Sequence, residues 1–144
     1  MTLLNVFDVS GSAMSAQSLR LNAIASNIAN ADSVADRPED TYRARYPVFA
    51  TMLQSSLAQG NSGTEAHYNA GVTVPGIVES ERPLNLRYEP GHPQADEAGY
   101  VTYPNVSVVE EMANMISASR AFQVNVEMMN TAKTMAERVL NMGQ

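Results

Sequence analysis

The sequence predicts a mainly α-helical protein with a small β-rich middle, in which long N- and C-terminal helices pair as a coiled-coil-like core. Apolar residues recur at steps of three and four near both ends, the spacing of one helix face. All seven prolines lie between Pro38 and Pro104, and proline disrupts helix interiors. In this middle part of the chain, apolar and other residues alternate in short runs, as in antiparallel strands.

These boundaries predict two parts. Residues 1–33 and 105–144 should form a discontinuous axial core domain made of the terminal helices, and residues 34–104 a middle segment of strands and loops. The middle segment carries little apolar mass for its length, so we expect it to depend on the helices or on neighbouring molecules for stability.

The N-terminal helix is expected from about Thr2 to about Asn30, a length of roughly 40 Å at 1.5 Å per residue. Gly11 weakens it by about 1 kcal/mol relative to alanine, and its asparagines compete for backbone hydrogen bonds. Such a helix depends on packing against other helices. Its predicted seam contains Leu3, Phe7, Ser10, Met14, Gln17, Leu21, Ile24, Ile28 and Ala31.

The C-terminal helix should begin after Pro104, where Ser107 and Glu110 have the spacing of a capping box. Lys133 and Arg138 lie toward its end, where cations suit the helix dipole. Its predicted seam contains Val108, Met112, Met115, Ser119, Phe122, Val126, Met129, Lys133, Ala136 and Leu140.

The middle segment predicts four short strands, near residues 42–48, 72–78, 84–88 and 100–103. Pro75 cannot donate a ladder hydrogen bond, so its strand should be an edge strand or contain a bulge. Residues 59–63 are expected to form a flexible loop, and residues 89–99 a long turn.

Composition excludes several classes of function. The formal net charge of −6 and nine scattered basic residues argue against a nucleic acid partner. The absence of cysteine excludes disulfides and thiolate chemistry. No cleavable signal peptide is evident, and no stretch has the roughly 20 apolar residues of a membrane span, so we expect no direct membrane span.

An enzymatic function finds little support. His92 lies near Glu89, Asp96 and Glu97, but one histidine in a Pro- and Gly-rich turn is more typical of a structural loop than of a metal site. Phosphate-loop, nucleophile-elbow and zinc-protease motifs are missing. We therefore predict no enzymatic activity, no cofactor and no metal. Two binding modules stay open as alternatives, a soluble coiled-coil adaptor and a periplasmic protein that contacts peptidoglycan.

Several segments resemble bacterial flagellar axial proteins, which form the rod, hook and hook junction. Residues 13–31, AMSAQSLRLNAIASNIANA, are similar to the N-terminal signature of that family. The proximal rod members are resembled more specifically in five further segments. These are YRARYPVF at 42–49, GVTVPGIVE at 71–79, YEPGHP at 88–93, GYVTYPNV at 99–106 and VEEMANMISASRAFQ at 109–123.

The resemblance implies a structural subunit of the proximal rod in the periplasmic part of the flagellar basal body. It also implies export by the flagellar type III apparatus, assembly through the terminal helices and transmission of motor torque. The alternative is another axial or rod/hook-junction subunit. Implied partners are copies of itself, other rod proteins, membrane-ring or rod-adaptor proteins at the rod base, and the export apparatus.

The two seams supply the predicted assembly interface. Its residues are Leu3, Phe7, Met14, Leu21, Ile24, Ile28, Met112, Met115, Phe122, Val126, Met129 and Leu140.

Overall fold

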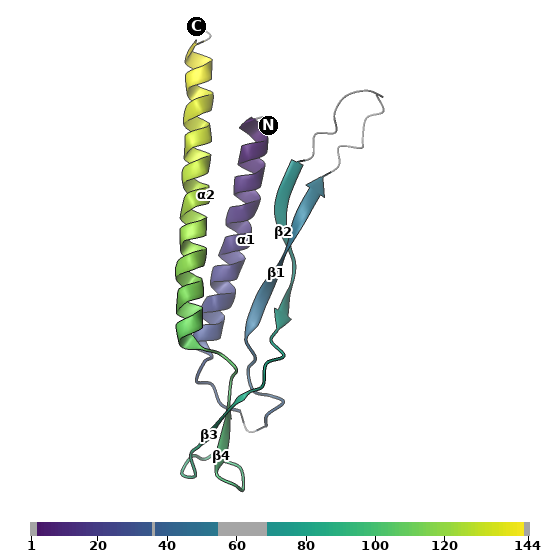
Figure 1. Cartoon of the computed structure of the whole chain (residues 1–144), viewed down its shortest axis with the longest axis vertical. Helices are drawn as coiled ribbons and strands as arrows, with labels where there is room; N and C mark the ends of the chain where they lie inside the picture. Colours follow the sequence, from purple (N-terminus) through teal and green to yellow (C-terminus); the bar gives the residue numbers. More distant parts are fainter. Residues whose placement is uncertain (1–2, 36, 55–68, 143–144) are drawn as a thin grey trace. The chain divides into compact units, whose positions relative to one another are not determined.

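Two long helices and four strands make up the chain in the computed structural model, which describes residues 3–35, 37–54 and 69–142. Their order is α1 (Leu3–Ala29), β1 (Arg45–Gln54), β2 (Asn69–Glu79), β3 (Asn85–Tyr88), β4 (Tyr100–Tyr103) and α2 (Val108–Met142) (Figure 1). The strands form two separate two-stranded sheets, β1 with β2 and β3 with β4. This confirms the predicted fold class. The loop expected at residues 59–63 lies outside the described residues.

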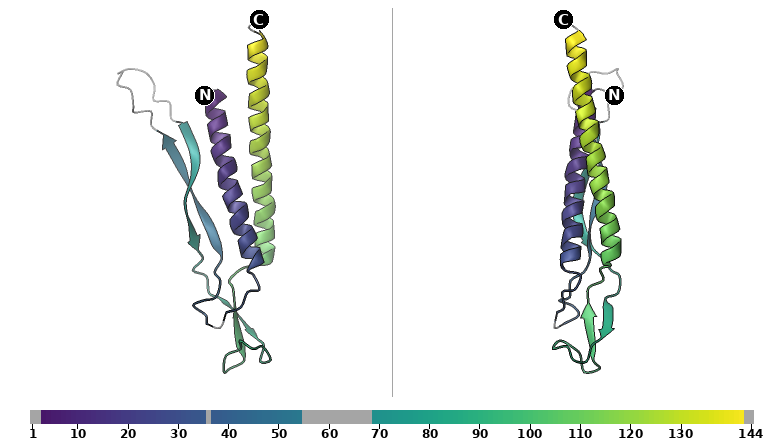
Figure 2. Two further views of the ribbon diagram at one scale, coloured as in Figure 1. Left: turned by 180° about the vertical axis from the view of Figure 1, so that it is seen from behind. Right: turned by 90° about the vertical axis from the view of Figure 1, so that its left-hand side faces the viewer.

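The contacts divide the chain into two compact units. The first unit contains Met1–Leu19, Phe49–Pro75 and Ala118–Gln144, and the second contains Arg20–Val48 and Gly76–Ser117. In each unit a segment of α1 lies alongside a segment of α2, as both views of Figure 2 show. The predicted division into an axial core of 1–33 and 105–144 and a middle of 34–104 stays a prediction.

In the first unit, the beginning of β2 lies close against α1. The Ser12 hydroxyl accepts a hydrogen bond from the Val72 amide at 3.1 Å and donates one to the Val9 carbonyl at 2.9 Å. A Cβ atom at Gly71 would stand 3.0 Å from the Ser12 Oγ, so a larger residue there would require the Ser12 side chain to shift by a few tenths of an ångström. Ala118 and Ala132 of α2 are buried in the same unit.

In the second unit, a small core forms where the helices meet the loops that follow α1 and precede α2. Ala31, Ala44 and Val106 are buried together, with Tyr42 and Tyr46 packed against them. At the end of α1, the Asn30 side chain donates a hydrogen bond to the Ser26 carbonyl at 2.8 Å.

The predicted cap of α2 is present in part. The Ser107 Oγ accepts the Glu110 amide at 3.5 Å. The Glu110 carboxylate lies 3.3 Å from the Arg82 guanidinium, in an exposed ion pair, rather than completing a reciprocal capping box.

The hairpin of β3 and β4 is antiparallel and in register from the pair Asn85–Tyr103 to the pair Tyr88–Tyr100. The long turn predicted at residues 89–99 connects these strands. Asp96 organises it, since its Oδ1 accepts the amides of Ala98 and Tyr100 at 3.0 and 2.7 Å. Gly99 has a φ of 83°, a left-handed conformation that favours glycine.

Candidate assembly interface

The predicted seam of α1 is turned toward the rest of the chain. Ile24 is 2% exposed and is the most buried of its large apolar residues. The other large apolar residues of the seam whose side chains are described are partly buried, namely Phe7, Met14, Leu21 and Ile28. The smaller seam residues Ser10 and Ala31 are buried. Leu3 begins the helix, but its side chain lies outside the described residues. The seam of α1 is therefore largely used within the single chain.

The seam of α2 is rotated from the predicted one. The predicted residues Met115, Phe122, Val126 and Met129 are partly buried, whereas Met112 and Leu140 are 54% and 73% exposed. The most buried line of α2 stands one residue ahead of Met112, at a spacing of seven. Its members are Glu111, Ala118 and Ala132, with Asn125 partly buried between them.

Many large apolar side chains of α2 are exposed in the part of the chain that the structure describes. We call them the outer apolar face of α2. In the second unit it contains Val109, Met112 and Ile116, and in the first unit Val124, Met128, Met135 and Met142, all of them exposed. Val139 and Leu140 are also exposed, but at about 3.6 residues per turn they lie on the same side of the helix as Glu111, Ala118 and Ala132. Exposed apolar residues in such number are typical of interaction surfaces.

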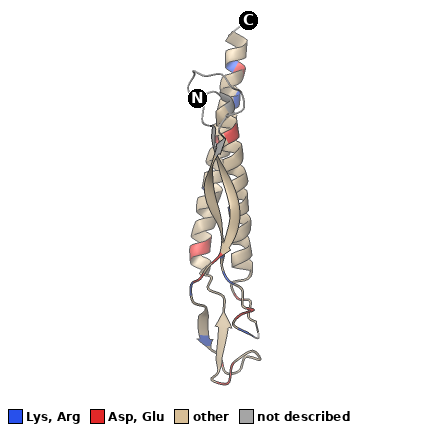
Figure 3. Cartoon of the chain, turned by 90° about the vertical axis from the view of Figure 1, so that its right-hand side faces the viewer, with Lys and Arg blue, Asp and Glu red and all other residues tan. Residues whose placement is uncertain are grey.

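Charge is sparse on α1, which carries only Asp8 and Arg20 within its 27 residues. The 35 residues of α2 include seven charged ones, and Figure 3 shows charged positions spaced along the helix ribbons. An ion pair between Lys133 and Glu137 joins successive turns of α2 at 3.9 Å, and a pair of this kind contributes only a few tenths of a kcal/mol. The surface of α1 therefore favours apolar rather than electrostatic association.

A buried polar cluster, which the sequence did not reveal, joins the two helices to the start of β1. Asn27 of α1 is fully buried and Glu111 of α2 is 1% exposed. The Asn27 Nδ2 donates to the Glu111 Oε2 at 3.2 Å and to the Arg45 carbonyl at 3.0 Å. Its Oδ1 accepts the Arg45 amide and the Tyr42 hydroxyl, both at 2.9 Å. Asn27 thus uses all four of its hydrogen-bonding positions.

Two tyrosines complete this cluster, and their phenols are held neutral. Tyr46 donates its hydroxyl to the Glu111 Oε1 at 3.1 Å. Burial raises the pKa of both Tyr42 and Tyr46, and the neighbouring Glu111 raises each further. Arg45 opposes the shift at Tyr42 and stacks over the Tyr42 ring at 5.4 Å.

A second buried amide, Asn105, holds the adjoining backbone. Its Oδ1 accepts the Ala44 amide at 2.8 Å, and its Nδ2 donates to the carbonyls of Arg82 at 2.8 Å and Ser80 at 3.3 Å. Ala44 and Arg45 are therefore held by two different asparagines, one just before α2 and one in α1. The Asn105 side chain therefore has a structural role in this part of the chain.

The predicted turn around His92 is built from structural hydrogen bonds. The His92 Nδ1 accepts the Gln94 amide at 3.2 Å, and the Glu89 carboxylate accepts the Tyr103 hydroxyl at 3.1 Å. Burial raises the pKa of Tyr103, and its hydrogen bond to Glu89 raises it further. In the described ranges, no group of three or more His, Cys, Asp or Glu residues is placed to hold a metal ion.

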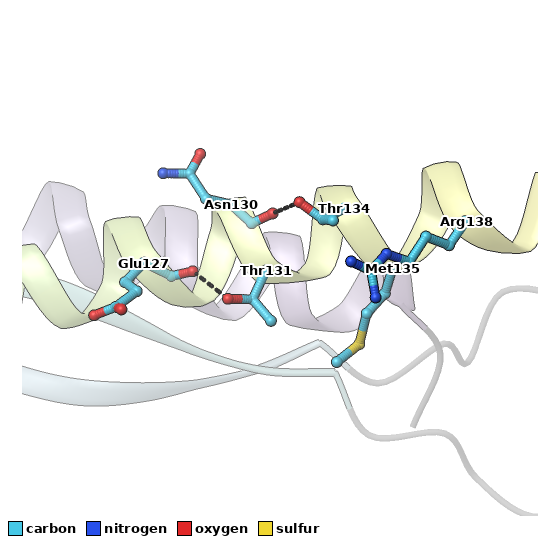
Figure 4. A pocket seen from close by; sticks show the side chains of 6 residues that line it. All are labelled: Glu127, Asn130, Thr131, Thr134, Met135 and Arg138. Carbon is cyan, nitrogen blue, oxygen red and sulfur yellow. Dashed lines mark hydrogen bonds between the residues drawn. The ribbon is translucent and has the colours of Figure 1, made fainter.

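The hollows of the surface offer little for a small ligand. One of about 320 Å³ lies along α2 beside Glu127, Thr131 and Arg138 (Figure 4). The hydroxyls of Thr131 and Thr134 there donate to carbonyls of their own helix at 2.9 and 3.0 Å. Another, of about 470 Å³, lies in the second unit beside the exposed ion pair of Arg45 and Glu79, which measures 2.8 Å.

Among the helices described, none combines the length and apolar character that crossing a bilayer requires.

The sequence is similar throughout its length to known flagellar proteins. Residues 7–35 match the family model of the flagella basal body rod protein, and residues 97–142 match that of the flagellar basal body rod FlgEFG protein C-terminal region. The flagellar basal-body rod protein FlgC of Escherichia coli O6:H1 is 49% identical over 144 residues, covering all of both chains. FlgC of Salmonella typhimurium is also 49% identical over full length, and FlgC of Borreliella burgdorferi is 35% identical over 97% of each chain.

Proposed function

We propose a structural role in rod assembly for this chain, which belongs to the FlgC family of flagellar basal-body rod proteins. It is a structural subunit of the rod and is located in the flagellar basal body. Its place in a rod means that it associates with other rod components. The outer apolar face of α2 is the observation that best supports assembly through the terminal helices.

The two sides of α2 would have different roles. The inner side, with Glu111, Ala118 and Ala132, is buried within the chain. The outer apolar face is then free to pack against helices of neighbouring subunits, whether copies of this chain or other rod proteins. Met112, which was predicted as an assembly residue, belongs to this face, and the predicted residue Leu140 is exposed near the end of α2. The partly buried predicted residues would contribute through their exposed surfaces, namely Phe7, Met14, Leu21, Ile28, Met115, Phe122, Val126 and Met129. Ile24 is buried within the chain.

The finer features of this role are also proposals. The chain would be exported by the flagellar type III apparatus, be placed in the proximal, periplasmic part of the rod and transmit motor torque. Membrane-ring or rod-adaptor proteins would contact it at the rod base. The similarity of residues 42–49 and 88–93 to proximal rod members supports the placement. The absence of cysteine suits an unfolded chain delivered to an oxidising compartment.

We propose no catalytic activity for this chain. The names of the relatives describe rod proteins. The titratable groups that first suggested chemistry, His92, Glu89 and Asp96, take part in hydrogen bonds that shape a turn.

The test compares a charge on the outer face with a charge inside the chain. Met128→Asp should leave the stability of the purified subunit within about 0.5 kcal/mol, because the side chain is exposed, yet block rod completion and motility. Ile24→Asp should destabilise the subunit itself by several kcal/mol, since it buries an unpaired carboxylate within one chain.

Chemical denaturation, motility assays and isolated basal bodies supply the measurements. His92→Ala is the control, because it loses a turn contact and no apolar surface, and it should leave motility largely intact. Complete rods and normal swimming with Met128→Asp would remove the outer apolar face from the assembly interface.

A further inference from the structure

The buried polar cluster contains a carboxyl group with no cationic partner. Glu111 is 1% exposed, and within the described ranges no basic side chain forms an ion pair with it. Its two oxygens accept instead from two neutral donors, the Asn27 amide on α1 and the Tyr46 hydroxyl on β1. Burial of a carboxyl in this way is costly compared with an apolar side chain. Overall stability therefore does not account for its presence.

The cluster connects three segments that are distant in the sequence. Glu111 and Asn27 are 84 residues apart, and Tyr46 and Glu111 are 65 apart. Asn27 in turn holds both backbone groups of Arg45, the first residue of β1. The Asn27 Nδ2 is shared between Glu111 and the Arg45 carbonyl, so the position of α2 bears directly on the group that binds the strand.

We infer that Glu111 is a positioning residue that couples the pairing of α1 with α2 to the docking of residues 42–46. With the helices paired, Glu111 holds the Asn27 amide and receives the Tyr46 hydroxyl, and residues 42–46 find a complete set of partners. When the helices are apart, Asn27 and Glu111 each provide only some of these hydrogen-bonding partners, and residues 42–46 are released. The inference does not depend on which proteins surround the chain in the rod.

Two adjacent backbone amides provide an internal comparison. The Arg45 amide donates to Asn27, which contacts Glu111, whereas the Ala44 amide donates to Asn105. If Glu111 acts through Asn27, its loss should release the Arg45 amide selectively. If it only contributes to general stability, both amides should exchange faster together.

The experiment is amide hydrogen exchange on the full chain, read residue by residue by NMR. In Glu111→Leu, which has similar bulk and no acceptor, the Arg45 amide should exchange about tenfold faster or more while the Ala44 amide changes little. Glu111→Gln keeps an acceptor oxygen for Asn27 and should restore slow exchange at Arg45. This rescue distinguishes the hydrogen bond from mere volume.

Asn114→Ala is the matched control. Asn114 lies one turn further along α2 and also bonds to α1, accepting from Arg20 at 3.4 Å, but it does not contact Asn27. Its loss should leave the ratio of Arg45 to Ala44 exchange unchanged. Equal acceleration of both amides in Glu111→Leu, or no change at either, would overturn the inference.

A global loss of folding in Glu111→Leu would count against it as well, because the carboxyl would then support the whole unit. In that case Tyr46→Phe gives a second measurement, since it removes only the hydroxyl that Glu111 accepts. Exchange at Arg45 should again rise relative to Ala44, by a smaller factor. An unchanged ratio in Tyr46→Phe would show that docking of the strand does not depend on Glu111.

Discussion

At the scale of single residues, amide and phenol groups hold the segment that leads into β1. Asn27 and Asn105 each bind backbone groups of the segment that leads into β1. Tyr42 and Tyr46 add their hydroxyls to the Asn27 and Glu111 side chains. These bonds require neutral phenols, because a phenolate cannot donate.

The raised pKa values of Tyr42 and Tyr46 predict a loss of stability in alkali. In the unfolded chain both phenols ionise near pH 10.0, but in the folded chain they hold their protons to higher pH. Their contribution is therefore fully present below about pH 10 and declines as the pH rises through the folded pKa values. Thermal unfolding between pH 8 and 12 should show a falling midpoint above pH 10.

A Tyr42→Phe/Tyr46→Phe variant serves as the reference for this effect. It should be less stable than the natural chain at pH 8, because hydrogen bonds to Asn27 and Glu111 are lost, but its midpoint should fall less steeply above pH 10. Parallel curves for the two proteins would show that these phenols do not carry the alkaline transition.

The sequence revealed some of these residues and hid others. The abundance of asparagine in both helices indicated that they need packing, and Asn27 shows one reason, because its side chain is committed to tertiary bonds. Glu111 gave no such signal. Glu111 directly precedes Met112, a residue of the predicted apolar seam, and a charged residue does not contribute to an apolar pattern. Only its partners from α1 and β1 explain its burial.

At the scale of elements, both helices and all four strands could be predicted, because the helices have a clear apolar period and all the prolines lie between them. The limits of β1 and β2 were harder to predict, since Pro47 and Pro75 lie inside these strands. The facing of α2 could not be predicted. Apolar residues lie on more than one side of it, so the spacing alone did not decide which line packs within the chain. The small residues Ala118 and Ala132 do so, since they permit a close approach, and the larger ones are left exposed.

The turn between β3 and β4 supplies a prediction about one glycine. Gly99 has a φ of 83°, and an added Cβ would lie 2.9 Å from the Tyr88 ring and 3.2 Å from Pro90. Gly99→Ala should destabilise the protein by about 1–2 kcal/mol, because an L-residue is disfavoured in this conformation. Urea denaturation would measure the change.

Gly91 in the same turn is the matched control. A Cβ there would meet no described atom within 4 Å, so Gly91→Ala should change the free energy of unfolding by less than about 0.5 kcal/mol. Equal effects at the two glycines would mean that the conformation of Gly99 is not a constraint on the hairpin.

At the scale of the whole molecule, each compact unit combines residues from both ends of the chain with residues from its middle. The Ser12 hydroxyl meets Val72 across 60 residues, and Asn27 meets Glu111 across 84. Such contacts close only after most of the chain is available, and folds dominated by distant contacts form slowly. A chain delivered end first would thus stay unfolded until its last segment arrives, which suits the proposed export route.

This arrangement predicts different fates for export and folding. A variant that ends at residue 107 lacks α2, and with it Glu111, Ala118 and Ala132, so neither unit can complete its buried set. If the N-terminal region carries the secretion information, the truncated chain should still leave the cytoplasm with an uncleaved N-terminus, but it should be protease-sensitive and absent from basal bodies.

The full chain should stay in the cytoplasm of cells that lack the flagellar export gate. Cell fractionation, limited proteolysis and N-terminal sequencing would measure these outcomes, and normal delivery of the full chain in gate-deficient cells would refute the proposed route.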